Sequence, residues 1–539
     1  MNWVKKTGRK LNKTALIAAL VHFAVSFFSD RLIFTYAWLD ASTAKQLLRS
    51  IETIGVKIAF LIMLIALWQA AFWVASHVER RYLKVAGGYM LFMTALLLLT
   101  WPGIWRMDEF GILSSSVQLF PHFWQNYITS VFYILALMLL PFPAGVIIVQ
   151  CACISVIVAR VVKLCTDEYR GRGGITWVLL MVPFFMFPVL DSNLYPMRMS
   201  LYAFLEVLLI AELFFLAKHV AEGREPDGGE KTRMFYITLL AAVVTVWRTE
   251  AVYYVVVYPL LLLLIGKGRR FLKQIMIYII VFVILFAPQK IGEKLTSGQQ
   301  YELTSVVLPL VPLIEAADEN GDAGDRELLA VIDQVVNVEL TLQKAAEGKS
   351  GINMFWGEPE FQREYTPEQF AQFKSAFYRL ALKHWQVFLE ERWTTFCDSS
   401  DLLENTTLLF SAEGVPNYEA FREYPLSGPV SDRLRTSVIK ILELRSSDNY
   451  DVKLAITDYV YSPIPSILFL AVVAVLLALK RKWTTLALVL SLSVKVPLIF
   501  LTAPSRLFMY YYSVYLFGYC VLFYAIYYLI MEKKTEMSD

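Results

Sequence analysis

The chain has 539 residues, 57% of them hydrophobic, a mean hydropathy of +0.51 and a formal net charge of +3. Repeated apolar runs of about 17–25 residues match the hydrocarbon thickness of a bilayer and exclude a soluble protein, and the small net charge gives no reason to expect a nucleic-acid partner. The five cysteines show neither metal-binding nor redox spacing.

Thirteen apolar runs are candidates for membrane-spanning helices. A cluster of lysines and arginines precedes the first run, and no small-residue cleavage signature follows it, which predicts an uncleaved anchor rather than a removable signal peptide. The runs cover residues 14–36, 56–75, 85–101, 127–140, 144–163, 175–190, 200–217, 234–248, 251–265, 271–288, 464–480, 483–503 and 507–530.

Positive charge decides which runs cross, because basic loops concentrate on the cytoplasmic side. If every run spans, the basic loops after residue 127 fall on the opposite side of the membrane from those before it. If 127–140 does not cross, all of the basic loops lie on one side. That run is short and ends at Pro141-Phe142-Pro143, which favours a juxtamembrane or re-entrant helix. We therefore predict twelve spans with cytoplasmic N- and C-termini. The basic segments are the N-terminus, 77–84, 163–172, 218–233, 266–270, 480–482 and 532–534.

The predicted fold is an all-α polytopic membrane protein with an extracytoplasmic, mainly helical domain. The expected parts are a two-span segment (1–84), a transmembrane core (85–288) whose first external loop is 101–143, the outer domain (289–463) and a three-span segment (464–539). In the outer domain, helical patterns cover 325–346, 367–396 and 431–445, and 413–429 is a loop. Aromatic residues on one side of the 370–396 helix favour packing on the membrane domain or at the interface over substrate contact; they include Phe370, Phe373, Phe377, His384, Trp385 and Phe388.

An acidic pair, Asp108-Glu109, follows directly on an apolar run in the first external loop. A solvated acidic turn at a helix end is the plain alternative, with Arg106 as a local partner. Acids beside a membrane are costly unless they are solvated or paired, and the surrounding tryptophans, phenylalanines and prolines are unusual for a simple loop. A carboxylate here is a suitable general base for an acceptor hydroxyl.

Basic residues also recur at the predicted outer ends of spans, where positive-inside statistics disfavour them. They are Arg198, Arg248, Lys290 and Arg506. Arginine forks bind phosphate oxygens bidentately, so a convergent set would bind a phosphate or pyrophosphate anchored in the membrane. The alternatives are interfacial snorkelling or pairing with an acid, as Arg248 and Glu250 can do together.

Other candidates on this face are His122 and Tyr511, which belongs to a tyrosine run. Most aromatic residues at span ends are membrane anchors. The predicted substrate-binding residues are Arg106, His122, Arg198, Arg248, Glu250, Lys290, Arg506 and Tyr511. His122 stands alone and two acids do not make a metal site, so no metal is predicted. The sequence shows no phosphate-binding glycine loop and no serine nucleophile elbow.

The order of these elements resembles the GT-C superfamily of glycosyltransferases, which contains protein O-mannosyltransferases and aminoarabinose transferases. The resemblance rests on a span that ends in a Pro/Trp turn, on the acidic pair after it, and on the stretches PGIWRMDEF, QNYITSVFY, KHWQVFLEERWTTF and PSRLFMYYY. It covers most of the chain from residue 85 onward. The pattern is most similar to that of bacterial members whose substrates are unassigned.

The resemblance implies a multispanning enzyme of the bacterial plasma membrane that uses a polyprenyl-phosphate sugar as donor. Asp108 would be the catalytic base with Glu109 beside it, and Arg248 and Arg506 would contact the lipid phosphate. No His-Pro-Pro element follows the acids, and two spans precede the core. The resemblance therefore does not say whether the acceptor is an envelope glycan, a lipid or a protein.

The expected reaction is an inverting sugar transfer on the outer face. One alternative is a transporter or flippase of lipid-linked sugars, which would require charges within spans and internal symmetry. Others are an envelope polysaccharide polymerase or ligase, which has no need of Asp108, and a non-catalytic scaffold whose outer domain binds a partner.

Overall fold

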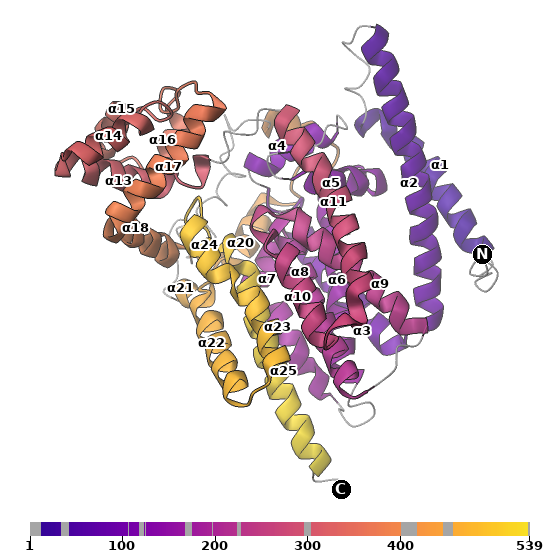
Figure 1. The fold of residues 1–539 in the computed structure, drawn as a ribbon. Coiled ribbons are helices and arrows are strands. Elements are labelled where there is room, and N and C mark those ends of the chain that lie inside the picture. Colours follow the sequence, from indigo (N-terminus) through magenta and orange to yellow (C-terminus); the bar gives the residue numbers. More distant parts are fainter. Residues whose placement is uncertain are drawn as a thin grey trace. The chain divides into compact units, whose positions relative to one another are not determined.

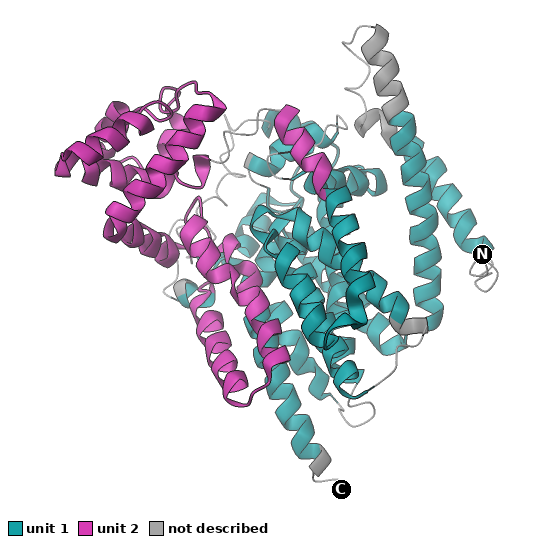
Figure 2. Ribbon diagram, in the orientation of Figure 1, with its two compact units in different colours: residues 1–285, 403–460, 516–539 teal, residues 286–402, 461–515 magenta. Residues whose placement is uncertain are grey.

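The computed structural model describes residues 12–33, 43–105, 107–117, 123, 126–167, 175–196, 198–223, 228–295, 303–399, 418–445 and 456–536. Within these ranges the chain is helical, with no strand and with an isolated bridge between Val336 and Gln362. Figure 2 shows its two compact units: unit 1 is Met1–Leu285, Leu403–Val460 and Leu516–Asp539, and unit 2 is Phe286–Leu402 and Tyr461–Tyr515.

Unit 1 holds the helices of the N-terminal half and a late segment of the chain (Figure 1). They are α1 (Lys13–Ile33), α2 (Thr43–His77), α3 (Arg80–Leu99), α4 (Met107–Ser116), α5 (Tyr127–Leu139), α6 (Pro143–Thr166), η3 (Thr176–Phe185), α7 (Phe187–Asn193), α8 (Arg198–Ala221), α9 (Gly228–Trp247), η4 (Thr249–Ala251), α10 (Tyr254–Ile265), η5 (Arg269–Phe271), α19 (Tyr418–Arg422), α20 (Asp432–Leu442) and α21 (Thr457–Val460). Helix α11 (Leu272–Leu295) starts in this unit and continues into unit 2.

Unit 2 combines a small helical core with the later apolar helices. It contains α13 (Val307–Asn320), α14 (Ala323–Ile332), α15 (Val338–Ala346), α16 (Gly351–Gly357), α17 (Pro367–Lys383), α18 (Trp385–Asp398), α22 (Ile464–Leu479), α23 (Trp483–Ser493), α24 (Lys495–Thr502) and η7 (Phe508–Tyr510). The last helix, α25 (Tyr512–Glu536), begins here and ends in unit 1.

Each of the thirteen apolar runs falls on helical structure within the described ranges. Seven helices among those residues are long and apolar enough to cross a membrane, or eight if the bent pair η3–α7 forms one span. Helix α5 has 13 residues. At 1.5 Å per residue it is about 20 Å long, less than the hydrocarbon core. The part of the chain that the structure describes is thus helical, and its long apolar helices are those of a membrane protein.

Two of the helices expected in 289–463 are interrupted. Asp333 accepts a hydrogen bond from the backbone N–H of Val338 at 3.0 Å, and the Asn337 side chain caps α15 by accepting from Leu340 N at 3.1 Å. These local bonds compete with helix continuation and separate α14 from α15. The second break lies at His384, between α17 and α18.

The aromatic side of 370–396 does not behave as one surface. Phe370, Phe373 and Phe377 are buried in the core that α13, α14 and α17 form within unit 2. Trp385 is exposed instead. The expectation that this whole side packs on the membrane domain or at the interface is therefore wrong for the α17 residues, because the unit has its own core to fill.

A buried polar network orders the turn between α7 and α8 in unit 1. The Gln150 amide of α6 donates to the carbonyl oxygens of Asn193 and Tyr195, at 3.2 and 2.6 Å. Asn193 in turn donates to the hydroxyl of Tyr89 in α3 at 3.1 Å. Buried polar groups that satisfy one another in this way hold a loop in one conformation.

Candidate functional site

Helix α4 carries the acidic pair in its first turn. Asp108 is exposed and Glu109 is buried. Negative side chains are favourable at this end of a helix because the first backbone N–H groups point toward them. The two acids thus differ in access: a bound molecule can reach Asp108, whereas Glu109 belongs to the packed side of α4.

The turn before α4 is held from both sides. Trp105 is fully buried and lies 6.4 Å from the Phe110 ring and 6.2 Å from the Tyr133 ring, measured between centroids. The backbone N–H of Ile104 donates to Leu194 O at 3.0 Å. These contacts connect α4 to α5 and to the end of α7, so the position of Asp108 depends on three elements of unit 1.

Helix α5 links the acidic pair with two other predicted regions. The Tyr133 hydroxyl donates to Pro196 O at 2.6 Å and lies within electrostatic range of both Glu109 and Asp108. One turn earlier in α5, the Trp247 indole N–H donates to the Thr129 hydroxyl at 3.0 Å. The acidic turn, the turn before Arg198 and the turn at Arg248 therefore gather in one region.

Arg248 is buried at the start of η4 and forms an ion pair with Glu250. Its guanidinium also contacts the sulfur of Met199 and lies 5.9 Å from the centroid of the Tyr202 ring. Pairing between Arg248 and Glu250 was one of the alternatives that the sequence left open, and it is present. The contacts with the first turns of α8 connect this pair to Arg198.

Arg198 is the first residue of α8 and is partly buried. A helix N-terminus presents unpaired N–H groups and a partial positive charge, which favour anions. Arg198 adds a guanidinium at the same end. The described part of unit 1 thus places an accessible carboxylate, a helix N-terminus and two arginines near the first half of α5.

Residues from the segment 418–445 cover the α4 turn, a contribution that sequence reasoning missed. The Phe421 ring of α19 lies 5.2 Å from Trp105 and 4.9 Å from Phe110. The Arg435 guanidinium of α20 donates to Thr100 O at 3.2 Å and to Gly103 O at 2.9 Å. The sequence feature that could have indicated this contact is the spacing of Arg435, Ile439 and Leu442, which places all three on one face of a helix. All three side chains are buried.

Three further site candidates belong to unit 2. Arg506 donates to Asp398 at 2.9 Å and to Glu391 at 3.2 Å, both on α18. Lys290 pairs with Glu293 at 2.7 Å. Tyr511 is buried against Phe396, with 5.3 Å between ring centroids. The structure therefore brings together Asp108, Glu109, Arg198, Arg248 and Glu250 in unit 1, and it describes Lys290, Arg506 and Tyr511 as parts of unit 2. Arg106 and His122 lie outside the described residues.

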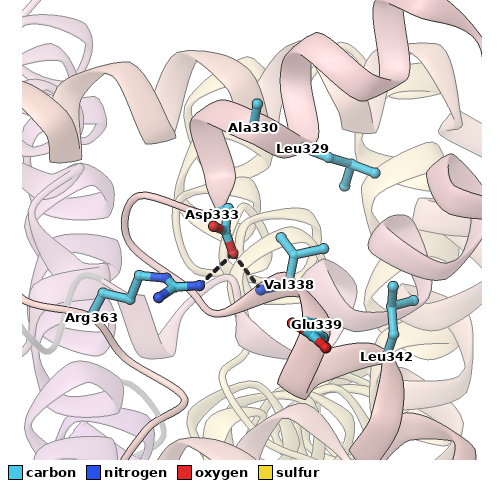
Figure 3. Close-up of a pocket in the computed structure, with 7 residues that line it drawn as sticks. All are labelled: Leu329, Ala330, Asp333, Val338, Glu339, Leu342 and Arg363. Atoms are coloured by element: carbon cyan, nitrogen blue, oxygen red, sulfur yellow. Dashed lines mark hydrogen bonds and ion pairs between the residues drawn. The ribbon is translucent and has the colours of Figure 1, made fainter.

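A separate depression lies in the helical core of unit 2, with a cavity volume of about 420 Å³. Figure 3 shows Asp333 between Arg363 and the Val338 backbone, to which it is joined at 2.9 and 3.0 Å, with Glu339 and apolar side chains also lining the depression. The Asp333 carboxylate thus fixes the connection between α14 and α15 and binds Arg363. In the residues that the structure describes, no three His, Cys, Asp or Glu side chains gather as metal ligands.

Comparisons of the chain with protein-family models, with curated proteins and with solved structures find no match.

Proposed function

We propose that the chain is a membrane glycosyltransferase that moves a sugar from a polyprenyl-phosphate carrier to an acceptor on the outer face of the bacterial plasma membrane. The observation that carries the proposal is the gathering of Asp108, Arg198 and Arg248 near the first half of α5 in unit 1, beside apolar helices. An accessible carboxylate next to cationic groups suits a reaction in which an acceptor loses a proton and a phosphate leaves.

In this proposal the acceptor hydroxyl attacks the anomeric carbon of the donor sugar. Asp108 takes the hydroxyl proton, the new glycosidic C–O bond forms, and the bond between the anomeric carbon and the phosphate oxygen breaks. The electron pair leaves with the polyprenyl phosphate, and attack from the opposite side inverts the anomeric configuration.

The cationic groups then differ in role. Arg198 and the start of α8 receive the phosphate, since they combine a guanidinium with a helix N-terminus. Arg248 is buried and paired with Glu250, so it acts as a fixed positive charge behind the phosphate rather than as the first contact. Glu109 is buried beside Asp108 and positions the start of α4.

The proposed topology has about twelve spans in a GT-C-like arrangement, with both termini cytoplasmic and 289–463 mainly on the outer face. Supporting it are the helices over the apolar runs, of which seven, or eight with the bent pair, are long and apolar enough to cross, and the short length of α5. A donor with a polyprenyl tail also explains why the catalytic groups are built onto apolar helices. The outer face lacks nucleotide sugars, so the carrier supplies the activated sugar.

The test is transfer by the purified chain in nanodiscs, with a panel of polyprenyl-phosphate sugars labelled in the sugar. Asp108→Asn should abolish release of polyprenyl phosphate, and the matched control Asp318→Asn, an exposed aspartate of α13, should leave it unchanged. Full activity of Asp108→Asn, with the variant folded by size-exclusion and thermal unfolding, would refute the role of Asp108.

A transporter or flippase of lipid-linked sugars is the second candidate, because two acids are fully buried within α8. Glu212 pairs with Arg160 and Arg233, each at 2.6 Å. Glu206 lies beside Tyr202 and Tyr254. Buried acids inside a span are a mark of transport pathways. Movement of labelled donor between leaflets, lost in Glu206→Gln and retained in Asp108→Asn, would favour this candidate over the transferase.

A further inference from the structure

One face of α18 is apolar and exposed, although the helix belongs to unit 2 and not to a span. Trp385, Leu389 and Trp393 are 54, 39 and 61% exposed. Residues four apart lie on the same side of a helix, so these three form one continuous face, which we call the α18 face.

Residues beside the α18 face fix α18 to the end of a candidate span in the same unit. The Arg392 guanidinium donates to Ala503 O at 2.9 Å, directly after the span Trp483–Thr502. Phe396 lies 6.2 Å from Phe500, again between ring centroids. In Figure 1, α18 lies beside α24, in agreement with these contacts. Trp393, the last residue of the α18 face, is therefore adjacent in sequence to Arg392, which binds the end of this span.

The lipid-facing surface of the span extends to the same level. Leu501 is 47% exposed and lies two residues before Ala503, whose carbonyl oxygen accepts the hydrogen bond from Arg392. Helix α18 is 14 residues long, so at 1.5 Å per residue Trp385 and Trp393 are about 12 Å apart along its axis. Trp393 and Leu501 thus lie one and two residues from the two ends of the Arg392–Ala503 hydrogen bond, and the rest of the α18 face continues from Trp393.

We infer that the α18 face rests in the lipid headgroup–acyl boundary and holds the helical core of unit 2 against the membrane. Tryptophan is enriched at this boundary because its ring is apolar and its N–H is polar. The neighbouring exposed residues Gln386 and Glu390 give the helix a polar flank, as an interfacial helix requires. Lipid is favoured over a protein partner because the face is continuous with the lipid-exposed surface of the span.

The test uses a nitroxide spin label on the full chain in lipid nanodiscs. The background carries Ser at Cys153, Cys397 and Cys520, since the remaining two cysteines are buried. Leu389→Cys reports the α18 face, and Glu390→Cys, exposed and one residue away, is the matched control. Power saturation then measures the access of each label to oxygen, which concentrates in lipid, and to a water-soluble nickel chelate.

The inference predicts that the label at 389 has higher access to oxygen and lower access to nickel than the label at 390. Equal, high nickel access at both positions would show that the face points into water. Low access of the 389 label to both reagents would show that protein covers it. Either outcome overturns the inference, and neither depends on whether the chain transfers sugar.

Discussion

The Arg435→Ala substitution tests whether the late segment 418–445 orders the turn that carries the acidic helix. Arg435 is buried, and its two hydrogen bonds end on the carbonyl oxygens of Thr100 and Gly103. These bonds connect positions more than 300 residues apart in the sequence. Removing the guanidinium leaves two buried carbonyl groups without this donor, five to eight residues before Asp108.

The expected loss follows from the number and type of bonds. A hydrogen bond with one charged partner contributes about 1.5–3 kcal/mol, and two such bonds to one side chain share part of that contribution. We therefore expect the local free energy of opening of the turn to fall by about 3 kcal/mol. Since 1.4 kcal/mol corresponds to a factor of ten, amides that report on opening should exchange about 100 times faster.

Hydrogen–deuterium exchange with mass spectrometry measures this directly. The reporters are the amides of Gly103 and Ile104, which donate to Thr100 O at 2.9 Å and to Leu194 O at 3.0 Å. Arg433→Ala, an exposed arginine on the same helix, is the matched control. If peptides covering 100–117 exchange no faster in Arg435→Ala than in Arg433→Ala, the reasoning is wrong. If the transferase proposal is also correct, sugar transfer should fall with the same substitution.

Two other parts of the chain make separate predictions. Glu212→Gln removes the charge that Arg160 and Arg233 share in a buried ionic group. Because Arg160 is partly exposed, we expect the free energy of unfolding to fall by about 3 kcal/mol, at the lower end for a broken buried pair. A lower midpoint of thermal unfolding measures this loss. In unit 2, the hydrogen bond from Lys383 lowers the pKa of Asp322 from 3.8 to about 2. A lowered pKa stabilises the fold above the unfolded value, so resistance of 303–399 to an acid-stable protease should fall as the pH drops from about 4 to 2. Lys383→Met should reduce that pH dependence, and an unchanged profile would contradict the assignment.

Much of the fold follows from local properties of the sequence. The thirteen apolar runs become helices because a backbone in lipid must satisfy its own hydrogen bonds, and run length alone reports this. The break before α6 is also readable, since Pro143 occupies the first turn of that helix, where its missing N–H costs nothing. The acidic pair can also be found from the sequence, because two charged residues directly beside an apolar run are unusual.

What only the tertiary structure decided are properties that depend on distant partners. Adjacent residues Asp108 and Glu109 have the same chemistry, yet α4 turns one outward and packs the other. Arg506 meets Glu391 and Asp398 in its own unit, so its charge is already paired. Arg435 acts on a turn at the other end of the sequence. Periodicity shows which side of a helix is apolar, but the packing of whole helices decides what that side contacts. The acidic pair could therefore be found from the sequence, whereas the residues around it could not.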